Sequence, residues 1–113
     1  MSMIALSKIN IYNKNNNYPN NSIYIGRGSI LGNPFSHIPN KGKFPVDTRE
    51  EAIVAYQDWL EEKLEDKTNP IYQEIQRLKL ILKETGELNL LCYCVPLPCH
   101  GYIIAKIIKE YND

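Results

Sequence analysis

Near its C-terminus the chain reads Leu88-Asn89-Leu90-Leu91-Cys92-Tyr93-Cys94-Val95-Pro96-Leu97-Pro98-Cys99-His100-Gly101. The first five residues are a short, mostly apolar run, which predicts a buried strand. Prolines and a glycine then favour a loop. Isoleucines at helical spacing follow, and they predict an amphipathic helix that runs to Tyr111. This order of strand, loop and helix is typical of the repeating strand–helix unit of an α/β fold.

A similar arrangement occurs earlier in the sequence. Ser22-Ile23-Tyr24-Ile25 is β-branched and aromatic, which predicts a short strand that Gly26 ends. The segment after it reads Gly26-Arg27-Gly28-Ser29-Ile30-Leu31-Gly32-Asn33-Pro34-Phe35. Partial alternation of apolar residues over Ile4–Tyr12 predicts one more strand. Residues 13–21 are rich in asparagine and residues 26–46 hold four glycines and three prolines, so both segments are predicted to be long loops.

Two further helices are predicted between these strands. Asp47-Thr48-Arg49-Glu50 resembles a capping box, and apolar residues then recur at helical spacing over residues 52–64. Asn69-Pro70 supplies a cap and a first-turn proline for the next helix. Gly86 is expected just after the end of that helix, where a left-handed residue is favoured.

Strands separated by helices favour a parallel sheet with right-handed crossovers. We therefore expect residues 1–113 to form a single α/β domain, small and Rossmann-like, with a mostly parallel sheet and about three helices. A mixed α+β arrangement with antiparallel first strands is the alternative. In a parallel sheet, the loops after residues 22–25 and 88–92 would emerge at the same edge, where open α/β sheets bind ligands.

Composition narrows the functional classes. The 13 basic residues balance the 13 acidic ones, which disfavours a general nucleic-acid binder, because phosphate neutralisation dominates that affinity. No signal peptide and no stretch long enough to span a bilayer is evident, so a cytoplasmic location away from membranes is expected. Three cysteines within eight residues favour reduced thiols over a disulfide framework. Homo-oligomerisation is left open, and no cofactor is predicted.

The glycine-rich segment has the chemistry of an anion-binding loop. Glycines allow the backbone to approach a ligand closely, arginine offers a planar fork to phosphate, and asparagine can contact a ribose or base. The segment lacks the lysine-serine pair of a P-loop and the third glycine of a dinucleotide fingerprint. A surface turn is the alternative. The candidate ligand-binding residues are Gly26, Arg27, Gly28, Ser29, Gly32 and Asn33.

The cysteine-rich segment allows three interpretations. Cys92, Cys94, Cys99 and His100 are a chemically acceptable zinc set, although their spacing is awkward. Cys99 and His100 are also expected in the first turn of the last helix, where free amides favour a thiolate and catalysis becomes conceivable. Burial as small apolar side chains is the third interpretation, and it suits Cys92 best. For Cys94, Cys99 and His100 we favour ligand contact.

These segments together resemble a family of small bacterial and phage domains of unknown function. The resemblance rests on Gly-Arg-x-Ser followed by Gly-Asn-Pro, on Tyr56-Gln57-Asp58-Trp59-Leu60, and on the Cys-x-Cys-x-Pro-x-Pro-Cys-His-Gly block at 92–101. It covers the chain from about Ser22 onward. The resemblance implies a compact α/β domain with an unassigned site at the motif positions. Tyr56 and Trp59 lie on an apolar helix stripe and are predicted to be core residues.

The leading functional hypothesis is a protein that binds a phosphate-bearing, nucleotide-derived small molecule between the two loops. One such role is that of a phage protein that sequesters a host nucleotide immune signal, an anti-defence function. Richness in asparagine, isoleucine and lysine suggests an AT-rich genome, which is compatible with a phage or a low-GC bacterium. Two alternatives are kept. One is a nucleotide or nucleoside hydrolase or glycosyl transferase that uses Cys99 or His100. The other is a zinc-stabilised interaction module.

Overall fold

A computed structural model describes residues 8–38, 43–93 and 99–110. Its main sheet has three strands in the order β1-β5-β2, with β1 at Lys8–Asn13, β5 at Glu87–Cys92 and β2 at Ile23–Tyr24. Both neighbours run parallel to β5. The predicted α/β class with a parallel sheet is therefore confirmed, and the antiparallel start of the alternative is not observed in the described strands.

A second, very small sheet lies within residues 26–46, which we predicted to be a loop throughout. Phe35–Ser36 forms β3 and Phe44–Pro45 forms β4, and the two pair in parallel. The Phe35 and Phe44 rings pack with centroids 5.2 Å apart. β3 and β4 are only two residues long and are held by backbone pairing and by this ring contact. Neither interaction produces a periodic pattern in the sequence, so the two strands were not predicted.

Three helices complete the fold: α1 at Arg49–Lys63, α2 at Pro70–Thr85 and α3 at Gly101–Glu110. Asn69 caps α2 and Gly86 adopts a left-handed conformation after it, both as predicted. The cap of α1 lies one residue later than predicted. The Thr48 hydroxyl, and not the Asp47 carboxylate, accepts the Glu51 amide at 3.1 Å.

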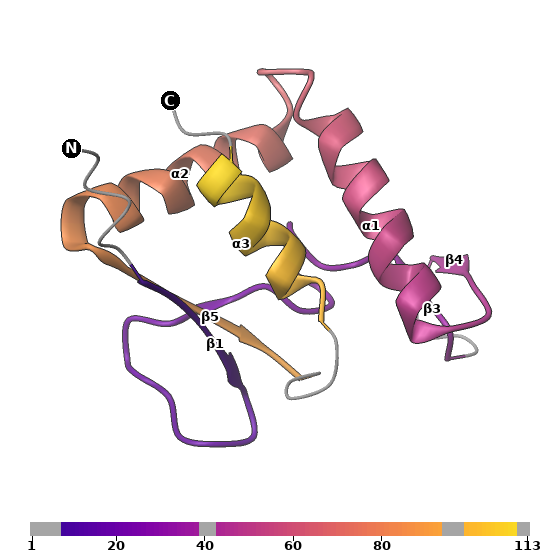
Figure 1. Cartoon of the computed structure of the whole chain (residues 1–113), viewed down its shortest axis with the longest axis horizontal. Coiled ribbons are helices and arrows are strands. Elements are labelled where there is room, and N and C mark those ends of the chain that lie inside the picture. The colour runs from indigo at the N-terminus through magenta and orange to yellow at the C-terminus, as the bar shows by residue number, and fades with distance from the viewer. Residues whose placement is uncertain (1–7, 39–42, 94–98, 111–113) are drawn as a thin grey trace.

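The helices pack on one another and on the sheet around a single core (Figure 1). Figure 1 shows α3 between the sheet and α1, with α2 along the top. In the same view β3 and β4 lie beside the first turn of α1. The central strand β5 is buried over every residue except Glu87. Burial on both faces explains why this strand reads as a nearly continuous apolar run.

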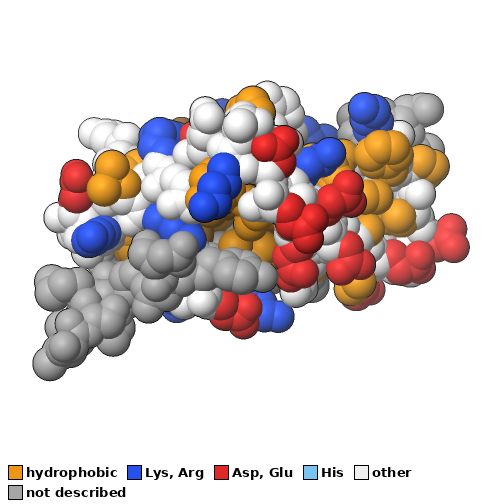
Figure 2. Space-filling view, turned by 90° about the horizontal axis from the view of Figure 1, so that it is seen from above, with side chains coloured by type: hydrophobic (Ala, Val, Ile, Leu, Met, Phe, Trp, Pro, Cys, Tyr) orange, Lys and Arg blue, Asp and Glu red, His pale blue; other side chains and the backbone are white. Residues whose placement is uncertain are grey.

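Charge is unevenly distributed over the surface. Figure 2 shows acidic side chains gathered toward the side on which α1 lies in Figure 1. The sequence of α1 explains this, because its acidic residues are Glu50, Glu51, Asp58, Glu61 and Glu62. None of the helices among the described residues combines the length and apolarity that crossing a bilayer requires.

Candidate functional site

The segments that follow β2 and β5 line one cavity of about 250 Å³. Because β2 and β5 are parallel, these segments leave the sheet at the same edge. The first turns of α1 close another side of the cavity. The lining residues with polar or aromatic chemistry include Arg27, Asn33, Arg49, Tyr93, Cys99 and His100.

Arg27 is held at the cavity by contacts within its own loop. Its guanidinium donates to the Asn33 carbonyl oxygen at 3.1 Å, and the Tyr24 hydroxyl donates to the Arg27 carbonyl oxygen at 2.9 Å. The next residue, Gly28, has φ +89°, a backbone conformation that side chains other than glycine rarely adopt. A guanidinium has five N–H donors, so a single backbone contact leaves most of them for a ligand.

The glycines and the serine of this loop shape the turn that carries Arg27. Gly26, Gly28, Ser29 and Gly32 do not line the cavity. The Ser29 hydroxyl and amide both donate to the Gly26 carbonyl oxygen, at 2.6 and 3.0 Å. A Cβ on Gly32 would lie 2.6 Å from that same oxygen. These residues therefore tighten the turn that presents Arg27, and their predicted contact with a ligand stays a prediction.

Asn33 lines the cavity and also ties the loop to α1. Its side-chain amide donates to the Ala52 carbonyl oxygen at 3.1 Å, and its side-chain oxygen accepts the Phe35 amide at 2.9 Å. Both ends of the side chain are thus used within the protein. Asn33 therefore positions the loop against the helix. Its predicted contact with a ribose or base stays a prediction.

Two arginines give the described lining of the cavity its charge. Arg27 and Arg49 both contribute, and no acidic side chain lies among the described lining residues. Within the described part of the chain, neither arginine takes part in an ion pair. Sequence reasoning missed Arg49 as a site residue because it stands inside a helix-capping pattern. His37 lines the cavity as well.

Cys99 and His100 lie immediately before α3, which begins at Gly101. We had predicted both residues in the first turn of this helix. The His100 carbonyl oxygen accepts the Ile103 and Ile104 amides at 3.0 and 3.1 Å, which places His100 at the cap of the helix. Both side chains are buried, with 1% of Cys99 and 6% of His100 exposed.

The orientation of the His100 ring is fixed by a backbone carbonyl. Its Nε2 lies 2.6 Å from the Ile25 carbonyl oxygen, at the end of β2. A carbonyl oxygen only accepts hydrogen bonds, so Nε2 carries the proton. In the neutral ring Nδ1 is then the acceptor, and it faces the Cys99 sulfur at 3.8 Å. Sequence reasoning found no group to orient His100, because a backbone carbonyl has no side-chain signature.

Tyr56 supports this arrangement from α1. Its ring packs edge-on against the His100 ring with centroids 5.0 Å apart, and its hydroxyl donates to the Leu31 carbonyl oxygen at 2.7 Å. Burial raises the pKa of the Tyr56 phenol far above its ordinary value, and the nearby Cys99 raises that pKa further. The phenol is therefore a neutral core group, as the apolar stripe of the helix predicted for Tyr56.

The predicted zinc set is only partly described by the structure. Cys92 and Cys99 lie side by side, with sulfur atoms 2.8 Å apart, and His100 adjoins them. Cys94 falls outside the described residues. Among the residues that the structure does describe, no cluster of three or more ligating side chains is positioned to hold a metal ion. The four-residue zinc site and the ligand contact of Cys94 stay predictions.

Comparison with known proteins identifies the family of this chain. No curated protein and no solved structure matches it. Residues 9–110 match a protein family that is described as a Domain of unknown function. The match includes both segments that line the cavity, and it spans nearly the whole chain. The chain therefore belongs to the family Domain of unknown function (DUF4326).

Proposed function

We propose that the cavity binds a phosphate-bearing, nucleotide-derived small molecule. The observation that carries this proposal is that Arg27 and Arg49 both line one cavity, with no acidic side chain among its described lining residues. Guanidinium groups bind phosphate through paired, charge-assisted hydrogen bonds. Arg27 comes from the loop after β2 and Arg49 from the start of α1, so the two can approach a phosphate from different directions.

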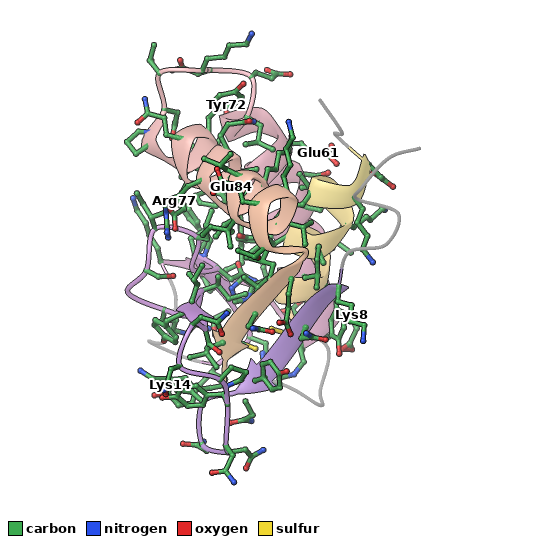
Figure 3. All side chains as sticks on the ribbon, turned by 90° about the vertical axis from the view of Figure 1, so that its left-hand side faces the viewer. Lys8, Lys14, Glu61, Tyr72, Arg77 and Glu84 are labelled. Carbon is green, nitrogen blue, oxygen red and sulfur yellow. The ribbon has the colours of Figure 1, made fainter. Side chains whose placement is uncertain are left out.

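Aromatic side chains beside the arginines suit the base of such a ligand. Tyr93 lines the cavity and is 51% exposed, and its ring meets the Tyr24 ring edge-on at 6.0 Å between centroids. Lys14, which lies at the lower end of the sheet in Figure 3, places its Nζ 4.7 Å from the Tyr24 ring centroid. Stacking on an exposed tyrosine stabilises a base without reading its identity.

The volume of the cavity limits the ligand. At about 250 Å³ it is slightly smaller than usual small-molecule sites, which start at about 300 Å³. We expect phosphate and sugar to fill the cavity, with the base lying outward near Tyr93. A sequestering role, in which a phage protein captures a host nucleotide immune signal, fits this proposal. Sequestration requires only that the ligand is bound, and it needs no catalytic group in the cavity.

The test is calorimetric titration of the full chain with nucleoside monophosphates and diphosphates, ADP-ribose and cyclic dinucleotides. Replacing Arg27 or Arg49 with Gln should weaken binding of the best ligand roughly tenfold to a hundredfold, because a hydrogen bond to a charged group contributes about 1.5–3 kcal/mol. Arg77→Gln is the matched control, since Arg77 pairs with Glu74 on α2 and does not line the cavity. Absence of binding by every compound at millimolar concentration would exclude this function.

A second candidate is an enzyme of nucleotide or nucleoside chemistry. It is supported by the relay from the Cys99 thiol to His100 Nδ1 and from His100 Nε2 to the Ile25 carbonyl oxygen. This order of nucleophile, base and orienting group is the one that activated thiols require. Mass spectrometry of each bound ligand after denaturation separates the two candidates. A binder returns its ligand intact, whereas an enzyme returns product, and Cys99→Ala and His100→Ala abolish that turnover.

A further inference from the structure

Cys92 and Cys99 are in direct contact in the protein core. Cys92 ends β5 and Cys99 precedes α3, and their sulfur atoms are 2.8 Å apart. A disulfide bond is about 2.05 Å long, so the sulfurs need to move together by only about 0.8 Å to bond. Neither cysteine is in a disulfide in this structure.

The surroundings of Cys99 favour its thiolate. The Gly101 amide, at the start of α3, donates to the Cys99 sulfur at 3.4 Å. The positive end of the α3 dipole lies at the same place, and both effects stabilise a negative sulfur. His100 Nδ1, 3.8 Å away, can accept the thiol proton. Cys92 has no comparable position, because it belongs to the strand and does not line the cavity.

The cavity gives a small oxidant a route to Cys99. Cys99 and His100 both contribute to its lining, although each is almost fully buried overall. A molecule the size of hydrogen peroxide is far smaller than the cavity of about 250 Å³. Cys92 is buried and is not among the lining residues. This arrangement gives the two thiols different roles, one that reacts first and one that resolves.

We propose that Cys92 and Cys99 form a dithiol site that hydrogen peroxide oxidises to a disulfide. The Cys99 thiolate attacks one peroxide oxygen and the O–O bond breaks. The released hydroxide takes the proton held by His100 and leaves as water, and Cys99 becomes a sulfenic acid. The Cys92 sulfur then attacks the Cys99 sulfur, the S–O bond breaks, and the hydroxyl leaves with the Cys92 proton as a second water. Two thiols are oxidised and one peroxide is reduced.

The proposal is tested by treating the reduced full chain with a small excess of hydrogen peroxide. We expect loss of two of the three thiols, a mass lower by two hydrogen atoms, and recovery of all thiols with dithiothreitol. Peptide mapping should join Cys92 to Cys99. A bond that involves Cys94, oxidation only to sulfinic acid, or no reaction would each overturn the assignment. So would a stoichiometric zinc ion that must be removed before the thiols react.

Variants separate the two roles. Cys94→Ser is the matched control and should still form the disulfide, whereas Cys92→Ala should stop at the sulfenic acid of Cys99, which dimedone traps. His100→Gln keeps a donor for the Ile25 carbonyl oxygen but removes the base, so oxidation at neutral pH should slow by at least about tenfold. Near-ultraviolet circular dichroism checks that each variant is folded. Peptide mapping of the disulfide uses the unmodified chain, so it tests the proposal even if a variant fails to fold. An unchanged rate of oxidation in folded His100→Gln would overturn the role of His100.

Discussion

Tyr56 is a buried polar side chain whose hydrogen bond joins α1 to the loop after β2. Its hydroxyl donates to the Leu31 carbonyl oxygen at 2.7 Å, and the residue has no exposed surface. Removing the hydroxyl would leave that carbonyl oxygen without its donor in the core. Such unsatisfied groups are more costly than the bond itself is stabilising, because water cannot replace the lost partner.

We therefore predict that Tyr56→Phe lowers the free energy of unfolding by about 1–3 kcal/mol at neutral pH. Urea denaturation monitored by circular dichroism measures this change. Tyr102→Phe is the matched control, because Tyr102 is 53% exposed, and it should change the stability by less than about 0.5 kcal/mol. Equal effects of the two substitutions would show that the buried hydroxyl has no special role.

The raised pKa of the Tyr56 phenol also predicts a pH dependence. A group whose pKa is higher in the folded state than in the unfolded state stabilises the fold below its unfolded pKa, here about 10, and this stability is lost as pH rises beyond it. We expect the free energy of unfolding to fall above about pH 10 in the unmodified chain. The stability of Tyr56→Phe should fall less steeply over the same range, and urea denaturation at a series of pH values measures both slopes.

At the level of the helices, local chemistry controls the boundaries of α2. The Asn69 side chain accepts the Ile71 amide at 2.8 Å, and Pro70 follows at the first helical position. We predict that Asn69→Ala lowers the free energy of unfolding by about 1 kcal/mol, since the first turn then loses its cap. Thermal unfolding checks this, with Asn17→Ala in the exposed 13–21 loop as control. A shift in the control as large as that in Asn69→Ala would contradict the capping assignment.

The same helices show what could be predicted from the sequence. Asn69 and Gly86 act on their immediate neighbours, so their roles follow from local sequence alone. Thr48 caps α1 in place of Asp47. Both side chains suit that position, so the sequence alone does not choose between them. The strands β3 and β4 were missed because they depend on contacts between segments. The convergence of Arg27 and His100 was expected from parallel strands, whereas Arg49 required knowledge of how α1 docks.

For the molecule as a whole, Asn33 connects the site to the scaffold. It joins the glycine-rich loop to α1 through the Ala52 carbonyl oxygen. We predict that Asn33→Ala weakens ligand binding without removing any charge, because Arg27 and Arg49 lose their fixed separation. The expected loss is about 1 kcal/mol in binding and a similar amount in stability. Calorimetry and urea denaturation measure the two, and Asn17→Ala should change neither.

Gly101 has a consequence for how the protein can move. A Cβ at this position would lie 3.1 Å from the Ile25 side chain and 3.2 Å from the Ile11 side chain, so α3 begins in tight contact with two strands. The imidazole anchored next to it is bonded to the end of β2. The start of α3, and with it the His100 side of the cavity, is therefore held closely against the sheet. We expect any widening that admits a ligand to come from the other lining residues, on α1 and around Phe35.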